Sequence, residues 1–395
     1  MTSPSLLKRV DPFLLMLVIV VTLASLLPAR GVEAVVFEWL ADIAIALLFF
    51  LHGAKLSRQA IVAGIGNLKL HALTLSATYV VFPLVGLAVV AAVQGWINPL
   101  LVSGVLFLTL LPSTVQSSIA FTSIARGNVA AAVCSASLSN LLGIIVTPLL
   151  VGLLIHSGTS GEGFDWGGVQ AIVIQLLLPF LAGHFLRPLI GRWVDGHKKL
   201  LGPIDRGSIL LVVYSAFSAA VDDGIWQALD VVDLIWLLGL SALILAAVMA
   251  YTTGAARVAG LRREDSVVLL FCGSKKSLAS GVPMAGALFA PAEVGMIVLP
   301  LMIFHQLQLF VCAWLAARMA RRVDAAGEAP SDADADADAG AGNASAAVPR
   351  GADAIASAAA ARGVTIEPAC RDGVAANCDL LASHAARMRG EGTPQ

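Results

Sequence analysis

The sequence predicts an all-α polytopic membrane protein with ten transmembrane helices, arranged as two inverted repeats of five. Its composition, its ten apolar segments and the one-sided placement of its basic residues predict this class. The chain has 395 residues, of which 58% are hydrophobic and 13% charged, and its mean hydropathy is +0.86. Soluble domains are closer to half apolar and a quarter charged. The composition therefore excludes an ordinary soluble protein, and without a basic stripe on a soluble fold we expect no nucleic-acid partner.

Ten apolar segments are long enough to cross a bilayer. A hydrocarbon core of about 30 Å needs roughly 20 apolar residues in a helix. The first segment follows Lys8 and Arg9 but lacks a convincing cleavage site, so we interpret it as a helix and not as a signal peptide. In chain order the segments are residues 11–28, 34–54, 70–93, 99–125, 128–155, 169–190, 207–222, 231–256, 265–290 and 294–317.

The basic residues of the connecting loops predict the orientation. Every loop lysine and arginine up to Arg322 falls on the same side of the predicted membrane, except Arg30. Lysine and arginine are retained on the cytoplasmic side of a membrane. We therefore expect a multi-pass protein of the plasma (inner) membrane with both termini in the cytoplasm.

The two halves of the transmembrane domain, residues 1–322, share features at matching places. The repeats are predicted at about 11–155 and 169–322, and because five helices is an odd number they enter the membrane from opposite sides. Segments four and nine are each broken, at Pro112-Ser-Thr114 and at Gly273-Ser-Lys-Lys276. Broken backbone at membrane depth is tolerated only against protein or a water-filled cavity. Paired breaks of this kind point to the binding site of a secondary transporter.

The remaining residues, 323–395, have a different composition. Aspartate alternates with alanine from Asp332 to Asp338, and an alanine- and glycine-rich stretch follows. Such a segment buries too little apolar surface to order itself. We expect a disordered cytoplasmic tail, with at most a short helix from about Ile355 to Arg362.

Lys275 and Lys276 are the most informative polar residues. A charge near the bilayer centre costs at least about 2.5–3.5 kcal/mol, so two adjacent ones need compensation. In a functional interpretation, at least one contributes positive charge at the crossing of the broken helices, by binding an anionic solute or by taking the place of a bound cation. In the alternative, one reaches an interface or forms a structural pair.

Hydroxyl and amide side chains gather at the other break and in segment five. Their oxygens suit a small cation or the polar groups of a solute, although serines also permit close helix packing. Asp42, an ionisable residue in an apolar stretch, is a site candidate by default; in the alternative it lies in an outward-facing aqueous vestibule or is a charge partner for a lysine. The candidate substrate- or ion-binding residues are Thr114, Gln116, Ser117, Ser118, Ser135, Asn140, Lys275, Lys276 and Ser277.

Motifs of enzymes and metal sites are missing from the sequence. The five cysteines are scattered singly, which is neither a disulfide framework nor a zinc spacing. There is no HExxH, no phosphate-binding GxxxxGK[ST] and no nucleophile elbow. We therefore expect no enzyme activity, no metal site and no cofactor.

Three stretches carry a family resemblance. They are LLFFLHGAKLSRQAI at 47–61, LLPSTVQSSIAFTSIARGNVAAAVCSASLSNLLGIIVTPLL at 110–150 and GSKKSLASGVPMAGALF at 273–289. They resemble the bile acid:sodium symporter family, most closely the branch that includes the seventh member of solute carrier family ten. The resemblance implies a panel domain and a core domain, crossing of segments four and nine, and transport by alternating access.

The resemblance also bears on sodium. The Ser-Asn pair of sodium-coupled relatives falls on Ser117 and Ser118, whereas their acidic ligand falls near Phe271, and Lys275 and Lys276 replace the following glutamine and asparagine. A lost carboxylate and a gained ammonium disfavour Na⁺ at that position. Our hypothesis is that a lysine substitutes for one bound cation; Na⁺ stays a candidate coupling ion.

The leading functional interpretation is a secondary active transporter of a small organic anion, embedded in the lipid bilayer and coupled to Na⁺ or H⁺. A monovalent cation:proton antiporter is an alternative, and it requires an essential intramembrane carboxylate, for which only Asp42 is available. A second alternative is a non-transporting membrane regulator that acts through its tail.

Overall fold

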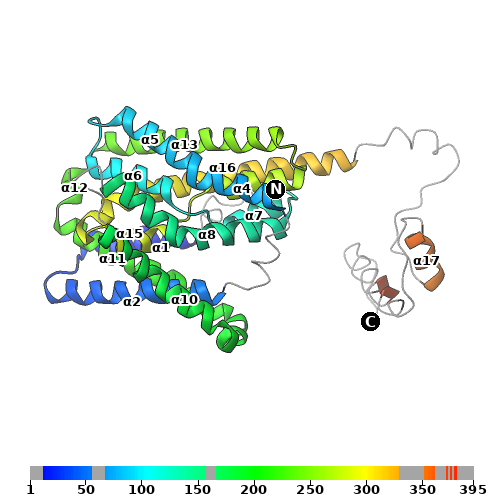
Figure 1. Cartoon of the computed structure of the whole chain (residues 1–395), viewed down its shortest axis with the longest axis horizontal. Coiled ribbons are helices and arrows are strands. Elements are labelled where there is room, and N and C mark those ends of the chain that lie inside the picture. Colours follow the sequence, from blue (N-terminus) through cyan, green and yellow to red (C-terminus); the bar gives the residue numbers. More distant parts are fainter. Residues whose placement is uncertain are drawn as a thin grey trace, which may run out of the picture. The chain divides into compact units, whose positions relative to one another are not determined.

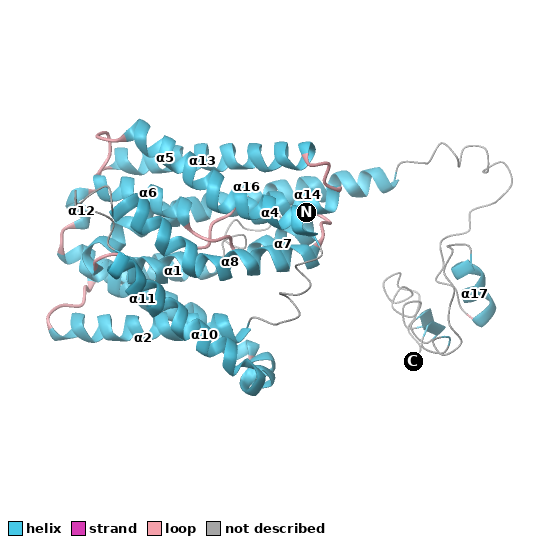
Figure 2. Cartoon of the chain, viewed as in Figure 1, coloured by secondary structure: helices cyan, strands magenta, loops and turns pink. Residues whose placement is uncertain are grey.

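A computed structural model describes residues 12–55, 67–156, 166–328, 351–360, 371, 374–375 and 378–379, and all secondary structure within these residues is helical (Figure 2). The chain divides into two compact units, Met1–Asp324 and Ala325–Gln395. The second unit contains α17 (Ala352–Ala360), which overlaps the short helix predicted near Ile355. Most of the predicted disordered tail lies outside the described residues.

The first half of the larger unit begins with α1 (Pro12–Leu26) and α2 (Val32–Lys55) (Figure 1). Asparagine side chains cap three of the following helices, because Asn67, Asn98 and Asn128 accept hydrogen bonds from the first turns of α4, α6 and α8. The helices that follow α2 are α4 (Leu68–Ser76), η3 (Ala77–Val81), α5 (Phe82–Val93), α6 (Pro99–Leu110), α7 (Gln116–Ile124), α8 (Val129–Val151) and η4 (Gly152–His156).

The second half begins with two long helices and ends with another. Asp230 and Asp233 form a capping box at the start of α13, which satisfies backbone N–H groups at that end. In chain order these helices are α10 (Trp166–Gly196), α11 (Lys198–Asp222), α12 (Ile225–Ala228), α13 (Val231–Val258), α14 (Arg263–Gly273), α15 (Leu278–Leu288) and α16 (Pro291–Glu328).

All ten predicted segments coincide with helices over their described parts. Among the described residues, seven helical stretches are long and apolar enough to span a membrane, while α1 and α6 are shorter. Segments four and nine are each divided into two helices, at residues 111–115 and 274–277, as their breaking residues predict. The seventh helix begins earlier in the chain than the predicted start at residue 207. The helix α11 begins at Lys198, and polar residues in its first turns hide this start from a hydropathy pattern.

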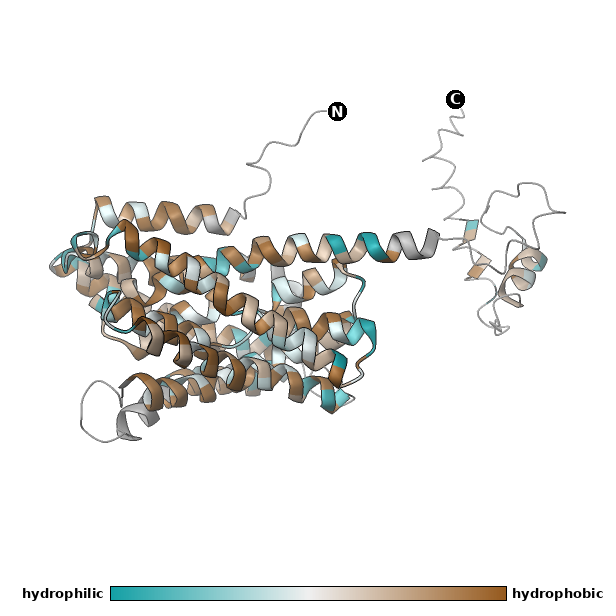
Figure 3. Ribbon diagram, turned by 90° about the horizontal axis from the view of Figure 1, so that it is seen from above, coloured by the Kyte–Doolittle hydropathy of each residue, from teal (hydrophilic) through white to brown (hydrophobic). Residues whose placement is uncertain are grey.

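Apolar residues run along these helices and hydrophilic residues gather near their ends (Figure 3). Many large apolar side chains are exposed, including Leu189 and Val258. In a soluble protein this would be unfavourable, but in a bilayer the hydrocarbon chains solvate such side chains. The structure is therefore that of a polytopic membrane protein.

The helices pack in two sets, and the second set includes helices of both broken segments. One set consists of α1, α2, α10 and α11, in which α2 packs against both α10 and α11. In the other set α5 packs against α6 and α13, and α14 packs against α4, α7, α8 and α13. The helix α15 contacts both sets, through α2, α10 and α11 and through α8. The second break therefore lies where the two sets meet.

Candidate functional site

The two breaks contact each other directly. The backbone N–H of Ser277 donates to the oxygen of Pro112 at 3.0 Å, and the Thr114 hydroxyl donates to the oxygen of Lys276 at 3.2 Å. The backbone groups of both breaks thus lose their helical hydrogen bonds, and some of them find partners in the other break. Buried backbone N–H and C=O groups require such partners. Two further hydroxyls extend this contact, with Ser113 donating to Cys272 O at 2.5 Å and Ser118 to Phe271 O at 3.0 Å.

Asn140 of α8 joins the two breaks from one side. Its Nδ2 donates to the oxygen of Ser113 at 2.6 Å, and its Oδ1 accepts a hydrogen bond from the Ser280 hydroxyl at 2.8 Å. Ser277 caps α15, since its Oγ accepts from the N–H of Ser280 at 3.1 Å. One amide therefore holds the first break and the N-terminus of α15 in a fixed relation.

Lys276 is fully buried, at 0% exposure. Its ammonium donates to three backbone oxygens, those of Thr78, Thr109 and Leu111, at 2.9, 2.8 and 2.6 Å. The same nitrogen lies 4.1 Å from the centroid of the Phe82 ring. Three acceptors for three N–H donors and an aromatic face compensate the buried charge.

Lys275 is equally buried but has different surroundings. Its ammonium donates to the Ser117 hydroxyl at 2.9 Å and lies 4.3 Å from the centroid of the Phe121 ring. No ion pair within the described ranges joins either lysine to a carboxylate. Asp42 is exposed on α2, so the structure does not bring it to the lysines.

A cavity of about 730 Å³ lies beside the crossing, between the two sets of helices. Of the predicted site residues, Thr114, Gln116, Ser117, Asn140 and Ser277 line it. The other four, Ser118, Ser135, Lys275 and Lys276, are buried and absent from its lining. The hydroxyl of Ser135 instead lies 2.8 Å from Nδ1 of His71. The lysines therefore stand behind the cavity wall, with Ser117 between Lys275 and the cavity.

The opposite wall carries charged residues that the sequence analysis assigned only to membrane topology. Lys55, Lys199 and Arg206 line the cavity, together with Asp205, and Lys55 forms an ion pair with Asp205. A basic residue beside a membrane helix end has the same sequence signature whether it fixes topology or lines a cavity. His52 of α2 and His305 of α16 also line the cavity. The packing of α2 against α11 brings His52, Lys55, Lys199, Asp205 and Arg206 together, whereas His305 lies near the crossing, with Nδ1 3.4 Å from the oxygen of Lys276.

Two helix N-termini face the cavity from the crossing. Gln116 and Ser117 begin α7, and Ser277 to Ser280 cap and begin α15, and all of them line the cavity. A helix N-terminus carries partial positive charge and unpaired N–H groups. With Lys199 and Arg206 on the opposite wall, positively charged or partially positive groups line the cavity from both sides, together with the carboxylate of Asp205, which pairs with Lys55.

The chain is similar in sequence to known proteins over most of its length. A protein of Pseudomonas aeruginosa, the uncharacterized protein PA2026, is 55% identical over 324 residues, which cover 82% of this chain and 97% of that protein. The Escherichia coli protein named "Putative symporter YfeH" is 51% identical over 319 residues, or 81% of this chain and 96% of its own length. Sodium/bile acid cotransporter 7 of Danio rerio is 27% identical over 313 residues, or 77% and 91%.

The sequence model of a protein family also matches most of the chain. The model of the SBF-like CPA transporter family matches residues 11–321, which include all the helices around the cavity. The relatives whose names state an activity are transporters and not enzymes. The chain therefore belongs to the SBF-like CPA transporter family, which confirms the resemblance to the bile acid:sodium symporters, and it is a membrane transporter.

Proposed function

We propose that the protein is a secondary active transporter that carries a small organic anion across the inner membrane by alternating access. In this proposal residues 1–322 form the transporter, with ten helices in two inverted repeats of five and both termini in the cytoplasm. Residues 323–395 form an accessory tail. The breaks between α6 and α7 and between α14 and α15 support the repeat, because they fall at corresponding positions of the two halves.

The observation that carries the proposal is the cavity at the crossing. Its volume of about 730 Å³ lies within the usual range for a small-molecule site. Polar groups lie on the side of the crossing, basic residues lie on the opposite wall, and apolar side chains such as Phe49, Phe180 and Met284 also line the cavity. This lining suits a solute with an apolar body and an anionic group.

Alternating access requires the cavity walls to move relative to each other. The crossing is held by hydrogen bonds among α7, α8, α14 and α15, whereas α2, α10 and α11 supply the opposite wall. We propose that these two sets are the moving bodies, and that the solute is exposed to alternate sides as one set shifts against the other.

The coupling ion in this proposal is Na⁺ or H⁺. The names of the relatives in Escherichia coli and Danio rerio favour symport, and the second name mentions sodium. An antiporter of a monovalent cation and a proton is less well supported. Asp42 is exposed and lies outside the cavity lining, and Asp205, which does line the cavity, is paired with Lys55.

A ligand screen on the purified full-length protein tests the proposal. Organic anions, matched neutral analogues and organic cations are compared by thermal stability in Na⁺ and in choline buffers, since a ligand that binds the folded state raises the Tm. We expect stabilisation by anions, followed by uptake of those anions into proteoliposomes. Stabilisation by neutral or cationic compounds alone, or binding without uptake, would contradict it.

Truncation after Glu328, which leaves α16 whole, separates the transporter from a regulator that acts through the tail. Uptake that persists in the truncated protein is expected if the helical domain is the transporter. Loss of all activity with unchanged thermal stability would instead support the regulatory alternative.

A further inference from the structure

Three backbone oxygens around the Lys276 ammonium form a cation site made entirely of main-chain groups. They come from Thr78 in η3, from Thr109 in the last turn of α6 and from Leu111 in the first break. These residues are distant from Lys276 in the sequence. The site therefore exists because three separate segments end or bend at one place.

Each of these oxygens lacks a regular helical partner. The N–H of Phe82 donates to Ala77 in the π-helical turn, so the corresponding donor for Thr78 would be Pro83, which has no N–H. Because α6 ends at Leu110, the carbonyls of Thr109 and Leu111 cannot bond to a following helical turn. Buried carbonyls without donors are unfavourable at membrane depth.

The charge distribution favours a cation at this point. The C-terminus of α6 carries partial negative charge, and the face of the Phe82 ring adds to the attraction. Distances of 2.6–2.9 Å from Nζ to the three oxygens are at or just below the short end of the range for N–H···O hydrogen bonds, as a charged donor favours. The geometry is that of a primary ammonium group with all three protons donated.

We propose that Lys276 is the tethered occupant of a monovalent-cation site, and that a chain with this side chain shortened binds a free small cation there, preferably a primary ammonium. The cation at this position is then covalently fixed and cannot be carried across the membrane with the solute. The inference stands on the contacts of Lys276 and is independent of the solute of the proposed function.

The neighbouring lysine provides a matched comparison. Lys275 is as deeply buried as Lys276, but its ammonium has one hydroxyl acceptor, Ser117, and one aromatic ring. Of the two lysines, therefore, Lys276 is the one whose ammonium group is bound by three converging carbonyl oxygens. Removal of the Lys275 side chain should not create a site that selects cations.

The experiment measures the Tm of full-length Lys276→Ala in detergent at constant ionic strength, with choline, Na⁺, K⁺, ammonium or propylammonium chloride. Propylammonium replaces the three carbons and the nitrogen that alanine lacks, and choline has no N–H to donate. We expect Lys276→Ala to melt at least 5 °C below the wild type in choline, and ammonium or propylammonium to restore half or more of that loss. The cations are present from membrane extraction onward, because the site is buried.

Two variants and the wild type serve as controls. Lys276→Met fills the same space without charge, so it should be destabilised and should not respond to added cations. Lys275→Ala and the wild type should show the same Tm in choline and in propylammonium. These comparisons separate occupation of the site from a general effect of the salt.

Several results would overturn the proposal. One is a Lys276→Met protein as stable as the wild type in choline, which would make the charge dispensable. Another is a Lys276→Ala protein that is insensitive to all four cations, or that cannot be recovered even when ammonium and propylammonium are present throughout. An equal response of Lys275→Ala or of the wild type would also contradict it.

Discussion

The side-chain amide of Asn140 donates a hydrogen bond to the backbone oxygen of Ser113 at 2.6 Å. Because Oδ1 of the same amide accepts from Ser280, this contact couples the first break to α15. We expect Asn140→Ala to reduce the free energy of unfolding by about 1–3 kcal/mol, since the bonds to Ser113 and Ser280 and a third, from Nδ2 to the Ala136 oxygen at 3.1 Å, are lost, and the Ser113 oxygen loses its amide donor. Thermal stability and proteoliposome uptake of an anion found in the ligand screen should both fall.

Asn140→Asp is a second variant for this test, and Ser137→Ala is its control. The aspartate keeps an acceptor for Ser280 but places a carboxylate oxygen against the Ser113 oxygen, so it should be no more stable than the alanine variant. Ser137 lines the same cavity from the same helix, and its replacement should leave the Tm close to that of the wild type. Asn140→Ala with unchanged stability would show that the amide does not hold the crossing.

A second prediction concerns the contact between α2 and α10. A Cβ atom on Gly53 would lie 1.9 Å from the Phe180 oxygen, and one on Gly183 would lie 2.0 Å from the Phe50 oxygen. These neighbours are backbone atoms, so the helices themselves would have to separate. We expect Gly53→Ala and Gly183→Ala each to destabilise the protein by about 1–3 kcal/mol, as overpacking of a close contact does.

Gly239 of α13 is the matched control for these glycines. A Cβ atom there would meet no atom within 4 Å, so Gly239→Ala should be neutral or slightly stabilising. The measurement is the Tm of the three purified variants in one detergent. Equal Tm values for all three would mean that α2 and α10 do not approach as closely as the structure shows.

A third prediction tests the basic wall of the cavity. Arg206→Gln and Lys199→Gln should each weaken binding of an anionic solute by about 1.5- to 5-fold, the range that corresponds to exposed ion pairs of about 0.2–1 kcal/mol. The effect should diminish at high salt, because exposed charges are screened. Calorimetry or Tm titration at two salt concentrations measures it.

Arg30→Gln controls for loss of a positive charge elsewhere. Arg30 is exposed, pairs with Asp222 at 2.7 Å and does not line this cavity. If this variant weakens anion binding as much as Arg206→Gln, the effect is one of net charge and not of the cavity wall.

The helical segments and both breaks were predictable from the sequence for a simple physical reason. Hydropathy over about 20 residues is a local property, and Pro112 and Gly273 are local signals for interruption. Residues close to these signals, such as Thr114, Ser117 and Ser277, could therefore be named as candidates, and the structure places them in the lining of the cavity. Their lining of the cavity follows from the position of the breaks.

The surroundings of the lysines could not be predicted in the same way. Residues in a break do not follow the 100° spacing of a helix, so the sequence does not tell which side Lys275 and Lys276 face. The acceptors of Lys276 are main-chain oxygens of Thr78, Thr109 and Leu111, and main-chain groups have no sequence signature. Lys199 and Arg206 were recognised only as topology signals, because their common wall depends on tertiary packing.

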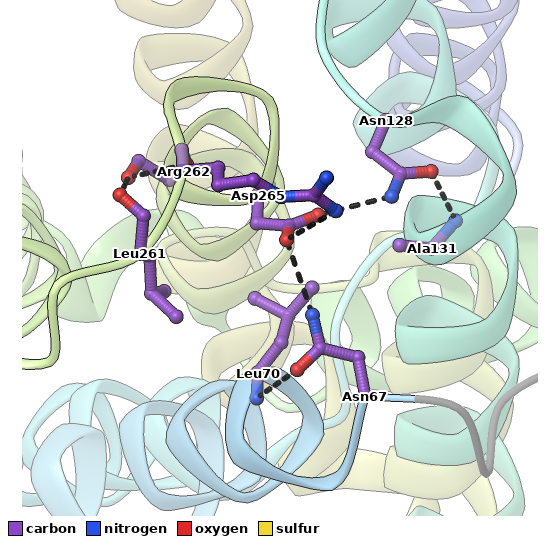
Figure 4. A network of polar contacts seen from close by, with 8 residues as sticks. Asn67, Leu70, Asn128, Ala131, Leu261, Arg262 and Asp265 are labelled. Atoms are coloured by element: carbon purple, nitrogen blue, oxygen red, sulfur yellow. Dashed lines mark hydrogen bonds and ion pairs between the residues drawn. The ribbon is translucent and has the colours of Figure 1, made fainter.

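The last prediction concerns a polar cluster at the start of α14, away from the cavity (Figure 4). The carboxylate of Asp265, which is 3% exposed, accepts hydrogen bonds from the side chains of Asn128 at 2.9 Å and Asn67 at 3.1 Å. These asparagines use their oxygens to cap α8 and α4. One carboxylate therefore orients two helix caps on neighbouring helices.

We expect Asp265→Ala to reduce the free energy of unfolding by about 2–3 kcal/mol, since both amides lose an acceptor and both caps lose their orientation. Arg262 also approaches Asp265, at 3.6 Å, but its side chain is 80% exposed, so Arg262→Ala should cost less than about 1 kcal/mol. Asp265→Asn, with one acceptor in place of two, should lie between them. Denaturation of the three variants measures this order, and an Arg262→Ala protein as unstable as Asp265→Ala would show that the ion pair, and not the pair of caps, holds the cluster.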